Sequence, residues 1–307
     1  MYFLYNSYAE RAERWSRLLT AELPNLRFIQ SLDDVDPADV TYILTWDPIA
    51  DLEKYTSLRI VFSAGAGVDQ FDVSSFPEGV ALVRMVEDSI AQSMAEYVVF
   101  AVLALHRDMI DYRNDQLTES WKPRDIQAAA RRRVGVMGIG HLGRTCLAKL
   151  QSFDFQLLGW NRSMKAIDGV DIYVGREEFQ EFLEQCDVLV NLLPLTEQTR
   201  EILNEDLFRQ LPLGAGVINV GRGGHLNEAD LLAALDSGQV GGAVLDVFQE
   251  EPLLLCNRLW KHPRVWVTPH IASTMQIEGG AAVVVDSILR DRSGQPLLHT
   301  VNRGFGY

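Results

Sequence analysis

The sequence is poor in cysteine, poor in basic residues and without a long apolar run, and each shortage narrows the class of protein. Its three cysteines, Cys146, Cys186 and Cys256, are odd in number and lack metal-ligand spacing, which indicates reduced thiols and no metal centre. Lysine and arginine total 28 against 42 aspartates and glutamates, for a net charge of −14. Nucleic-acid binding usually needs a basic face, so this charge argues against a nucleic-acid partner.

The longest uninterrupted apolar run covers residues 97–105, well short of the ~18 residues that a membrane span needs. The start, Met1-Tyr2-Phe3-Leu4-Tyr5-Asn6, shows no basic region and no signal-peptide pattern. We therefore expect no membrane association and a cytoplasmic location. With 47% apolar and 23% charged residues, the 307-residue chain has the profile of a globular protein long enough for two domains.

Short apolar runs alternate with helical patterns along the first third of the chain. Residues 1–5, 27–30, 40–45, 58–63 and 81–84 predict strands, and residues 9–22 predict an amphipathic helix. This alternation is typical of a parallel sheet with crossover helices. Residues 90–107 predict a long buried helix, whereas residues 111–127 are polar and irregular.

A second α/β unit begins at Arg133. Its predicted strands cover residues 134–137, 156–160, 188–192, 216–220, 242–245 and 265–267, a pattern that matches the doubly wound nucleotide fold. We expect a last helix, residues 276–290, to return to the N-terminal sheet. The prediction is an α/β protein whose doubly wound parallel-sheet nucleotide domain, residues 99–275, is inserted into a smaller flavodoxin-like α/β domain, residues 1–98 plus 276–307.

A glycine-rich stretch, Gly138-Ile139-Gly140-His141-Leu142-Gly143, joins a predicted strand to a predicted helix. Glycines in this pattern permit a tight turn and let a pyrophosphate approach N–H groups at a helix N-terminus. The alternative is a turn that merely packs strand on helix. The context favours a dinucleotide site that includes His141 and Leu142.

The next predicted strand leads into Asn161-Arg162-Ser163-Met164-Lys165. Proteins that prefer the unphosphorylated dinucleotide usually carry Asp or Glu there. Here no carboxylate would repel a 2′-phosphate, and Arg162, Ser163 and Lys165 can bind one. Unless this is only a solvated basic turn, NADP(H) is the preferred cofactor, with NAD(H) as the second choice.

Three distant stretches each place one polar residue in a context that suits carbonyl reduction. They are Arg222 in Val220-Gly221-Arg222-Gly223-Gly224, Glu251 in Asp246-Val247-Phe248-Gln249-Glu250-Glu251-Pro252, and His270 in Thr268-Pro269-His270-Ile271-Ala272-Ser273.

Arg222 follows a predicted strand, where a planar guanidinium can hold the carbonyl and carboxylate oxygens of a keto acid. Its glycine neighbours are expected to let backbone crowd a ligand, although a surface ion pair is the alternative. His270 can supply a proton if it is charged near neutral pH, and a carboxylate offsets the opposing effect of burial. Glu251 is assigned that task because it directly precedes Pro252, and Glu250 is expected to be solvated.

Taken in order, these stretches resemble the D-isomer-specific 2-hydroxyacid dehydrogenase family and, within it, the glyoxylate/hydroxypyruvate reductase A type. The resemblance runs across nearly the full length. It also rests on Phe62-Ser63-Ala64-Gly65-Ala66-Gly67-Val68-Asp69, Arg84-Met85-Val86-Glu87-Asp88, Glu96-Tyr97, Trp121-Lys122-Pro123 and Leu192-Leu193-Pro194-Leu195-Thr196. It implies a substrate domain interrupted by the nucleotide domain, a cleft between the two, and usually a homodimer.

Residue by residue, the resemblance implies that Arg222 binds substrate, His270 is the acid/base and Glu251 is its partner. It also implies that Asp246 meets the nicotinamide carboxamide. Further cofactor contacts are expected at Leu193, Pro194, Val220 and Gly221, and substrate contacts at Trp46, Ala64, Gly65, Ala66, Gly67 and Arg84. Trp46 and Arg84 are equally compatible with packing and surface charge, and the Gly65 loop with a plain turn.

The expected activity is reduction of small 2-keto acids, glyoxylate to glycolate and hydroxypyruvate to D-glycerate, with His270 as proton donor. Two alternatives stay open. One is a dinucleotide-sensing binding protein without turnover, and the other is a reductase of a bulkier 2-keto acid such as phosphohydroxypyruvate.

Overall fold

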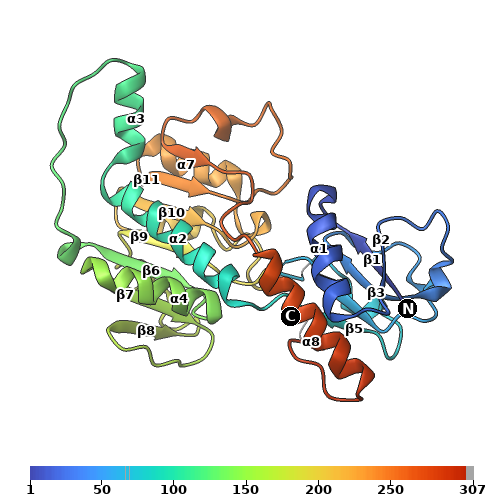
Figure 1. Ribbon diagram of the computed structural model, residues 1–307. Coiled ribbons are helices and arrows are strands. Elements are labelled where there is room, and N and C mark those ends of the chain that lie inside the picture. The colour runs from blue at the N-terminus through green and yellow to red at the C-terminus, as the bar shows by residue number, and fades with distance from the viewer. Residues whose placement is uncertain (66, 69, 302–307) are drawn as a thin grey trace. The chain divides into compact units, whose positions relative to one another are not determined.

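The computed structural model describes residues 1–65, 67–68 and 70–301. The chain divides into two compact units, Met1–Ile90 with Met275–Tyr307 and Ala91–Thr274 (Figure 1). The first division lies inside helix α2 (Asp88–His106), upstream of the boundary after residue 98 that the sequence pattern suggests. The reason is packing, because Met94, Ala95 and Val98 already belong to the core of the second unit.

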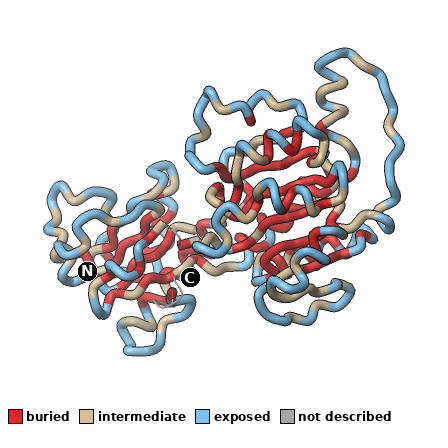
Figure 2. Tube along the Cα trace, turned by 180° about the vertical axis from the view of Figure 1, so that it is seen from behind, coloured by how far each residue is buried: buried red, intermediate tan, exposed pale blue. Residues whose placement is uncertain are grey.

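The first unit is built on a five-stranded parallel sheet with the order β2-β1-β3-β4-β5. Its strands are β1 (Tyr2–Asn6), β2 (Arg27–Ile29), β3 (Val40–Thr45), β4 (Ile60–Ser63) and β5 (Ala81–Val83). This is the flavodoxin-like order. Every residue of β4 is buried, as expected for a parallel strand covered on both faces, and the buried strands contrast with exposed loops in Figure 2.

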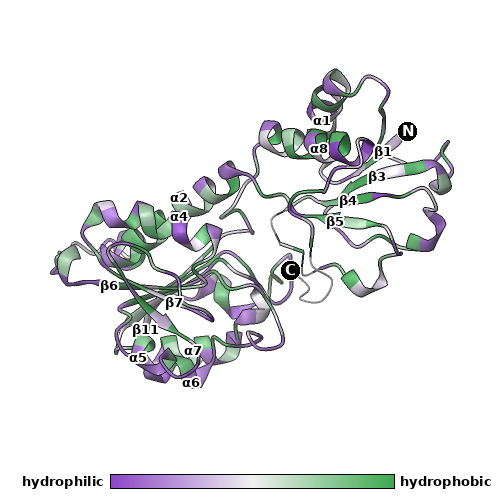
Figure 3. Ribbon diagram, turned by 90° about the horizontal axis from the view of Figure 1, so that it is seen from below, coloured by the Kyte–Doolittle hydropathy of each residue, from purple (hydrophilic) through white to green (hydrophobic). Residues whose placement is uncertain are grey.

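Helices α1 (Ala9–Glu22) and α8 (Ile277–Arg292) pack against each other in this unit. Helix α1 buries Ala12, Trp15 and Leu19, which share one face at helical spacing, and it carries both apolar and polar residues in Figure 3. A Cβ on Gly280 of α8 would lie 2.9 Å from the Trp15 ring, so glycine allows this close approach. The last helix therefore returns to the N-terminal sheet.

The segment after α8 protects the edge of that sheet. The N–H of Val301 donates to the carbonyl of Leu82 at 2.9 Å, and the N–H of Arg84 donates to the carbonyl of His299 at 3.1 Å. These antiparallel bonds satisfy backbone groups that an edge strand would otherwise expose.

The second unit is built on a seven-stranded parallel sheet with the order β12-β11-β10-β9-β6-β7-β8. Its strands are β6 (Arg133–Met137), β7 (Gln156–Asn161), β8 (Val170–Val174), β9 (Val188–Asn191), β10 (Ala215–Asn219), β11 (Val240–Leu245) and β12 (Val265–Val267). The order reverses between β6 and β9, the switch point at which ligands bind in such sheets. The predicted α/β fold class is confirmed.

The remaining helices of this unit are α3 (Met109–Leu117), α4 (His141–Leu150), α5 (Phe179–Leu183), α6 (Glu205–Gln210) and α7 (Glu228–Ser237). Two sequence predictions need correction. Strand β8 was not expected, although four of its five residues are apolar; it is an edge strand with no fully buried residue. The segment predicted as irregular, residues 111–127, begins within α3, which buries Ile110 as its apolar anchor.

Helix α2 is long and apolar enough, by length and composition alone, to cross a membrane. Half of its apolar window is buried inside the protein, and Ala101 and Val102 are 0% exposed within the core around β6 and β9. Such burial is typical of the core helix of a globular domain.

Candidate functional site

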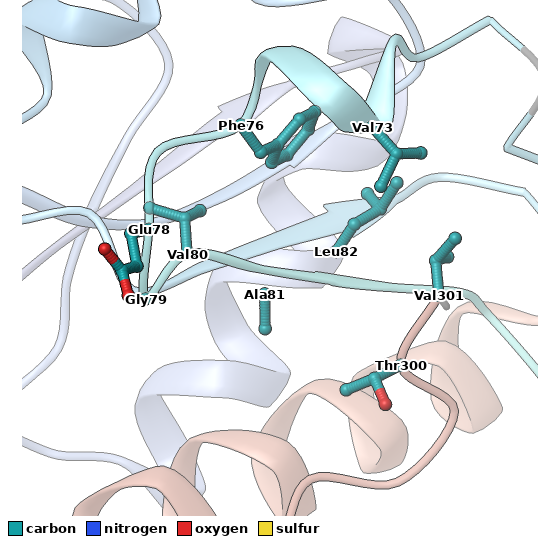
Figure 4. A pocket seen from close by; sticks show the side chains of 9 residues that line it. All are labelled: Val73, Phe76, Glu78, Gly79, Val80, Ala81, Leu82, Thr300 and Val301. Atoms are coloured by element: carbon teal, nitrogen blue, oxygen red, sulfur yellow. The ribbon is translucent and has the colours of Figure 1, made fainter. Parts of the chain in front are cut away.

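A cavity of about 350 Å³ lies beside β5 in the first unit (Figure 4). It is lined by Val73, Phe76, Glu78, Gly79, Val80, Ala81, Leu82, Thr300 and Val301. Among these nine residues the only ionisable side chain is Glu78. An anionic ligand would meet a carboxylate and no cation there, so the cavity does not suit a keto acid.

The three glycines of the glycine-rich loop after β6 have different structural roles. Gly138 has φ +91°, and a Cβ there would lie 2.7 Å from the Leu192 carbonyl oxygen. A Cβ on Gly143 would lie 2.2 Å from the Gly138 carbonyl oxygen, whereas one on Gly140 would meet nothing within 4 Å. The first and third glycines are thus required by the chain itself, and the second leaves open space of the kind that a pyrophosphate needs.

Helix α4 begins directly after this loop, with Gly140 as its N-cap and no side-chain cap hydrogen bond. Its first N–H groups are therefore available to an anion at the positive end of the helix. His141 is exposed and Leu142 half-buried at this end. On the other side of the switch point, after β9, Leu193 is buried and Pro194 is exposed. Contact of these residues with a dinucleotide stays a prediction.

The basic turn after β7 lies next to the same loop. The Lys165 ammonium is 3.4 Å from the carbonyl oxygen of Ile139, and the Asn161 amide donates to the Ser163 carbonyl at 2.9 Å. Arg162 and Ser163 are exposed. The turn from Asn161 to Lys165 thus combines two cations and a hydroxyl without a carboxylate.

Arg222 follows β10 and is half-buried, with its Nη1 donating to the Gly221 carbonyl at 2.8 Å. The glycines beside it are required by protein packing, and crowding of a ligand by this backbone stays a prediction. A Cβ on Gly223 would lie 1.8 Å from the Phe248 carbonyl oxygen. A Cβ on Gly221 would lie 2.9 Å from both the Asn191 amide nitrogen and His225 Nδ1. Val220, just before, is 4% exposed.

His270 and Glu251 are hydrogen-bonded to each other, with His270 Nδ1 at 2.7 Å from Glu251 Oε2. Their side chains are 29% and 36% exposed, so the pair is open on one side. The other carboxylate oxygen of Glu251 accepts the Phe248 N–H at 3.0 Å. Glu250 is exposed. Of the two neighbouring glutamates, Glu251 is therefore the one that the fold turns toward the histidine.

The charge of Arg222 acts on the Glu251 carboxylate. Burial by itself would raise the pKa of Glu251, but its hydrogen bond to His270, its bond from the Phe248 N–H, and the charges of His270 and Arg222 outweigh burial. The pKa of Glu251 therefore lies below its ordinary value, and the carboxylate stays charged near neutral pH. His270 and Arg222, which lie far from Glu251 in the sequence, thus both act on the pKa of Glu251 in the fold.

Asp246 holds the backbone around His270. It is 1% exposed, and its carboxylate accepts the N–H groups of Ile271 and Ala272, each at 2.8 Å, and the Thr268 hydroxyl at 2.6 Å. His270 has φ +54°, a left-handed conformation that is unfavourable for residues other than glycine. The Asp246 clamp stabilises this conformation. Contact of Asp246 with a carboxamide stays a prediction.

The substrate contacts expected in the first unit gather at the ends of β3 and β4. The Trp46 ring packs on Gly65, where a Cβ would lie 2.7 Å from it. Ser63 Oγ donates to the Gly67 carbonyl at 2.8 Å and lies 3.4 Å from the Gly65 nitrogen, and Ala64 N–H donates to the Thr45 carbonyl. Arg84 is half-buried, and its Nε has no hydrogen-bond partner among the described residues. Ala66 lies outside the described residues.

Several polar residues that support this site carry no role in the sequence prediction. Tyr97 of α2 lies 2.5 Å from the Thr268 hydroxyl, which joins it to the Asp246 clamp. Asn191 and Asn219 are 0% exposed and hydrogen-bonded to each other at 3.0 Å, at the ends of β9 and β10. An asparagine that closes a buried apolar strand is a usable signal for such a pair. Within the described ranges, no group of three or more His, Cys, Asp or Glu could hold a metal ion.

Comparison with known proteins agrees with this geometry. The sequence pattern described as "D-isomer specific 2-hydroxyacid dehydrogenase, NAD binding domain" matches residues 99–272. A curated glyoxylate/hydroxypyruvate reductase A from Salmonella heidelberg is 41% identical over 300 residues, which cover 95% of this chain and 96% of the relative.

Two solved structures are similar over nearly the whole chain. A D-isomer specific 2-hydroxyacid dehydrogenase from Xanthobacter autotrophicus, in complex with NADPH and MES, has a TM-score of 0.92 at 35% identity and covers 99% of each chain. An NADPH-dependent glyoxylate/hydroxypyruvate reductase from Sinorhizobium meliloti, in complex with NADP and sulfate, has the same TM-score and identity and covers 100% of this chain and 99% of its own.

The chain therefore belongs to the D-isomer specific 2-hydroxyacid dehydrogenase family. It is an oxidoreductase with a nicotinamide-dinucleotide-binding domain, and its similarity to relatives of the reductase A type extends across both units. The predicted family resemblance is confirmed.

Proposed function

We propose that this chain is an NADPH-preferring reductase that converts glyoxylate to glycolate and hydroxypyruvate to D-glycerate. The observation that carries the proposal is the His270–Glu251 pair at 2.7 Å with Arg222 in its electrostatic neighbourhood. These are a proton donor, its charged partner and an anion-binding cation, which reduction of a keto acid requires. The reductase A relatives, 41% identical over 95% of the chain, support the choice of substrates.

In this proposal Arg222 holds the carboxylate and carbonyl oxygens of the keto acid and polarises the carbonyl group. When bound, the reduced nicotinamide supplies a hydride to the carbonyl carbon. His270, as the imidazolium, gives its proton to the carbonyl oxygen, and Glu251 holds the ring by Nδ1 so that Nε2 faces the substrate.

The glycine loop, His141, Leu142, Leu193, Pro194, Val220, Gly221 and Asp246 are proposed to hold the dinucleotide. Asn161, Arg162, Ser163 and Lys165 are proposed to receive the 2′-phosphate, which accounts for the preference for NADPH. Two solved relatives that contain NADPH or NADP support this assignment. Replacing Arg162 by Ala should raise the KM for NADPH by about tenfold and leave the KM for NADH unchanged, since a charge-assisted hydrogen bond contributes roughly 1.5–3 kcal/mol. Equal losses for both cofactors would contradict the assignment.

Trp46, Ala64, Gly65, Gly67 and Arg84 of the first unit are proposed as further substrate contacts. The Trp46 ring against Gly65 leaves little room beside the loop, which favours two- and three-carbon acids over a bulkier 2-keto acid. A homodimer and a cytoplasmic location also belong to the proposal. A dinucleotide-sensing protein without turnover would not need the His270–Glu251 pair.

The decisive measurement is a steady-state comparison of NADPH and NADH with glyoxylate, hydroxypyruvate and a bulkier 2-keto acid. We expect turnover of the two small acids, faster with NADPH. Purified protein that oxidises neither cofactor with any of these acids would rule the proposal out and favour the sensing function.

A further inference from the structure

A fully buried histidine, His225, is hydrogen-bonded through its ring to the backbone of Arg222. It ends the short 3-10 helix η6 (Gly223–His225) and is 0% exposed. The N–H of Arg222 donates to His225 Nδ1 at 2.9 Å, and the same ring nitrogen lies 3.1 Å from the Arg222 carbonyl oxygen. In either tautomer, therefore, the ring has a backbone atom of Arg222 as its partner.

The His225 ring also restricts position 221, directly before Arg222, to a residue without a Cβ. A Cβ on Gly221 would lie 2.9 Å from His225 Nδ1 and 3.0 Å from its Cε1, so the imidazole packs flush against that glycine. On the far side, Gly223 is in similarly close contact with the backbone of Phe248. The loop that carries Arg222 is thus enclosed on both sides by the rest of the unit.

Asn219 completes this enclosure. Its side-chain amide donates to the Arg222 carbonyl at 3.2 Å, and its side-chain oxygen accepts the Gly221 N–H at 3.3 Å. Because β10 ends at Asn219, the backbone of Arg222 has left the sheet ladder. Side chains make the hydrogen bonds that a neighbouring strand would otherwise make to this backbone, and His225 Nδ1 accepts the Arg222 N–H.

We propose that His225 is a positioning residue that fixes the direction in which the Arg222 guanidinium meets the keto acid. This inference rests on the proposed function, which places Arg222 on the substrate. A guanidinium lies at the end of a long side chain, so a small rotation of its backbone displaces it widely. A misplacement of about 1 Å in such a contact lowers catalysis by roughly 100-fold.

The test compares His225→Leu, which removes the acceptor, with His225→Asn, whose side-chain oxygen can still accept the Arg222 N–H. Leaving a buried N–H unpaired should raise the KM for glyoxylate by about 10- to 100-fold. The dissociation constant for NADPH, measured by fluorescence titration, should change less than the KM for glyoxylate, because His225 packs against Gly221 but makes its hydrogen bonds to the backbone of Arg222. His225→Asn should recover most of the loss.

His106→Leu is the matched control, since His106 is another buried histidine of the same unit, 7% exposed and packed on Phe155. It should leave the KM for glyoxylate unchanged. If His225→Leu does not fold, His225→Gln takes its place, because it stays polar but moves the acceptor by one bond, and the same rise in KM is expected.

A double-mutant cycle separates this inference from the proposed function. Arg222→Ala combined with His225→Leu should be no worse than Arg222→Ala alone, because His225 acts through Arg222. Additive effects, equal losses in keto-acid and NADPH binding, or no recovery with His225→Asn would each overturn the positioning role. An Arg222→Ala variant with unchanged keto-acid kinetics would instead overturn the proposed function.

Discussion

Replacing Glu251 by Gln tests whether the charge of this residue, rather than its shape, supports proton donation by His270. Glutamine keeps the length of the side chain but has a single carbonyl oxygen, whereas the two carboxylate oxygens of Glu251 have separate partners, His270 Nδ1 at 2.7 Å and the Phe248 N–H at 3.0 Å. The amide oxygen can keep one of these two bonds, and the amide NH2 group then faces the other partner. The substitution therefore removes the negative charge and one acceptor while it keeps the volume of the side chain.

The size of the effect follows from the geometry of the pair. Two unit charges about 4 Å apart attract each other by about 1 kcal/mol in water and about 4 kcal/mol at an effective dielectric constant of about 20. Since the two side chains are 29% and 36% exposed, solvent screens much of this attraction. An interaction of about 1–2 kcal/mol corresponds to about a 5- to 30-fold change in a rate or equilibrium constant.

The assay is kcat/KM for glyoxylate reduction at neutral pH, followed by NADPH oxidation. The variant should lose about 5- to 30-fold in kcat/KM, because His270 then gives up its proton without a hydrogen-bonded negative partner. A kcat/KM within about twofold of the unchanged protein would refute this reasoning.

Further predictions concern stability and the glycine loop. The pKa of Glu251 is lowered in the folded chain, so the charged carboxylate stabilises the fold above the ordinary carboxyl range. This stability is lost as the pH falls through the pKa that Glu251 has in the folded chain. E251Q should therefore flatten the dependence of the urea midpoint on acid pH. Gly143→Ala, with its Cβ 2.2 Å from a carbonyl oxygen, should lower the free energy of unfolding by about 1–3 kcal/mol and weaken NADPH binding in a fluorescence titration. Phe182→Ala, 0% exposed, should lower it by about 3–5 kcal/mol in urea unfolding. Arg14→Ala removes a half-exposed ion pair with Glu278 and should leave the urea midpoint nearly unchanged, because solvent screens such a pair, and a clear loss would mean that Arg14 has another partner.

Local chemistry is enough to predict the two parallel sheets. Buried parallel strands are nearly continuous apolar runs, and helices with one apolar face lie between them, so both α/β units can be read from the amino acids alone. Helix α1 and strands β3 and β12 have the predicted bounds. The edge strand β8 is missing from the prediction although its apolar residues favour a strand. Helix α3 is missing because it buries Ile110 but leaves Met109 and Leu117 exposed, so its apolar residues do not form one buried face.

The candidate site also has a part that the sequence predicts and a part that it does not. Glycine spacing, the basic turn at Asn161–Lys165, and the identities of Arg222, Glu251 and His270 are present in the sequence, because each depends on residue type and on a neighbouring strand. Contact between His270 and Glu251, 19 positions apart, depends on how β11 and β12 pair and on the loops that follow them. So do the Asp246 clamp and the buried His225 behind Arg222. Such contacts join residues that no local pattern connects, and only the packed tertiary structure decides them.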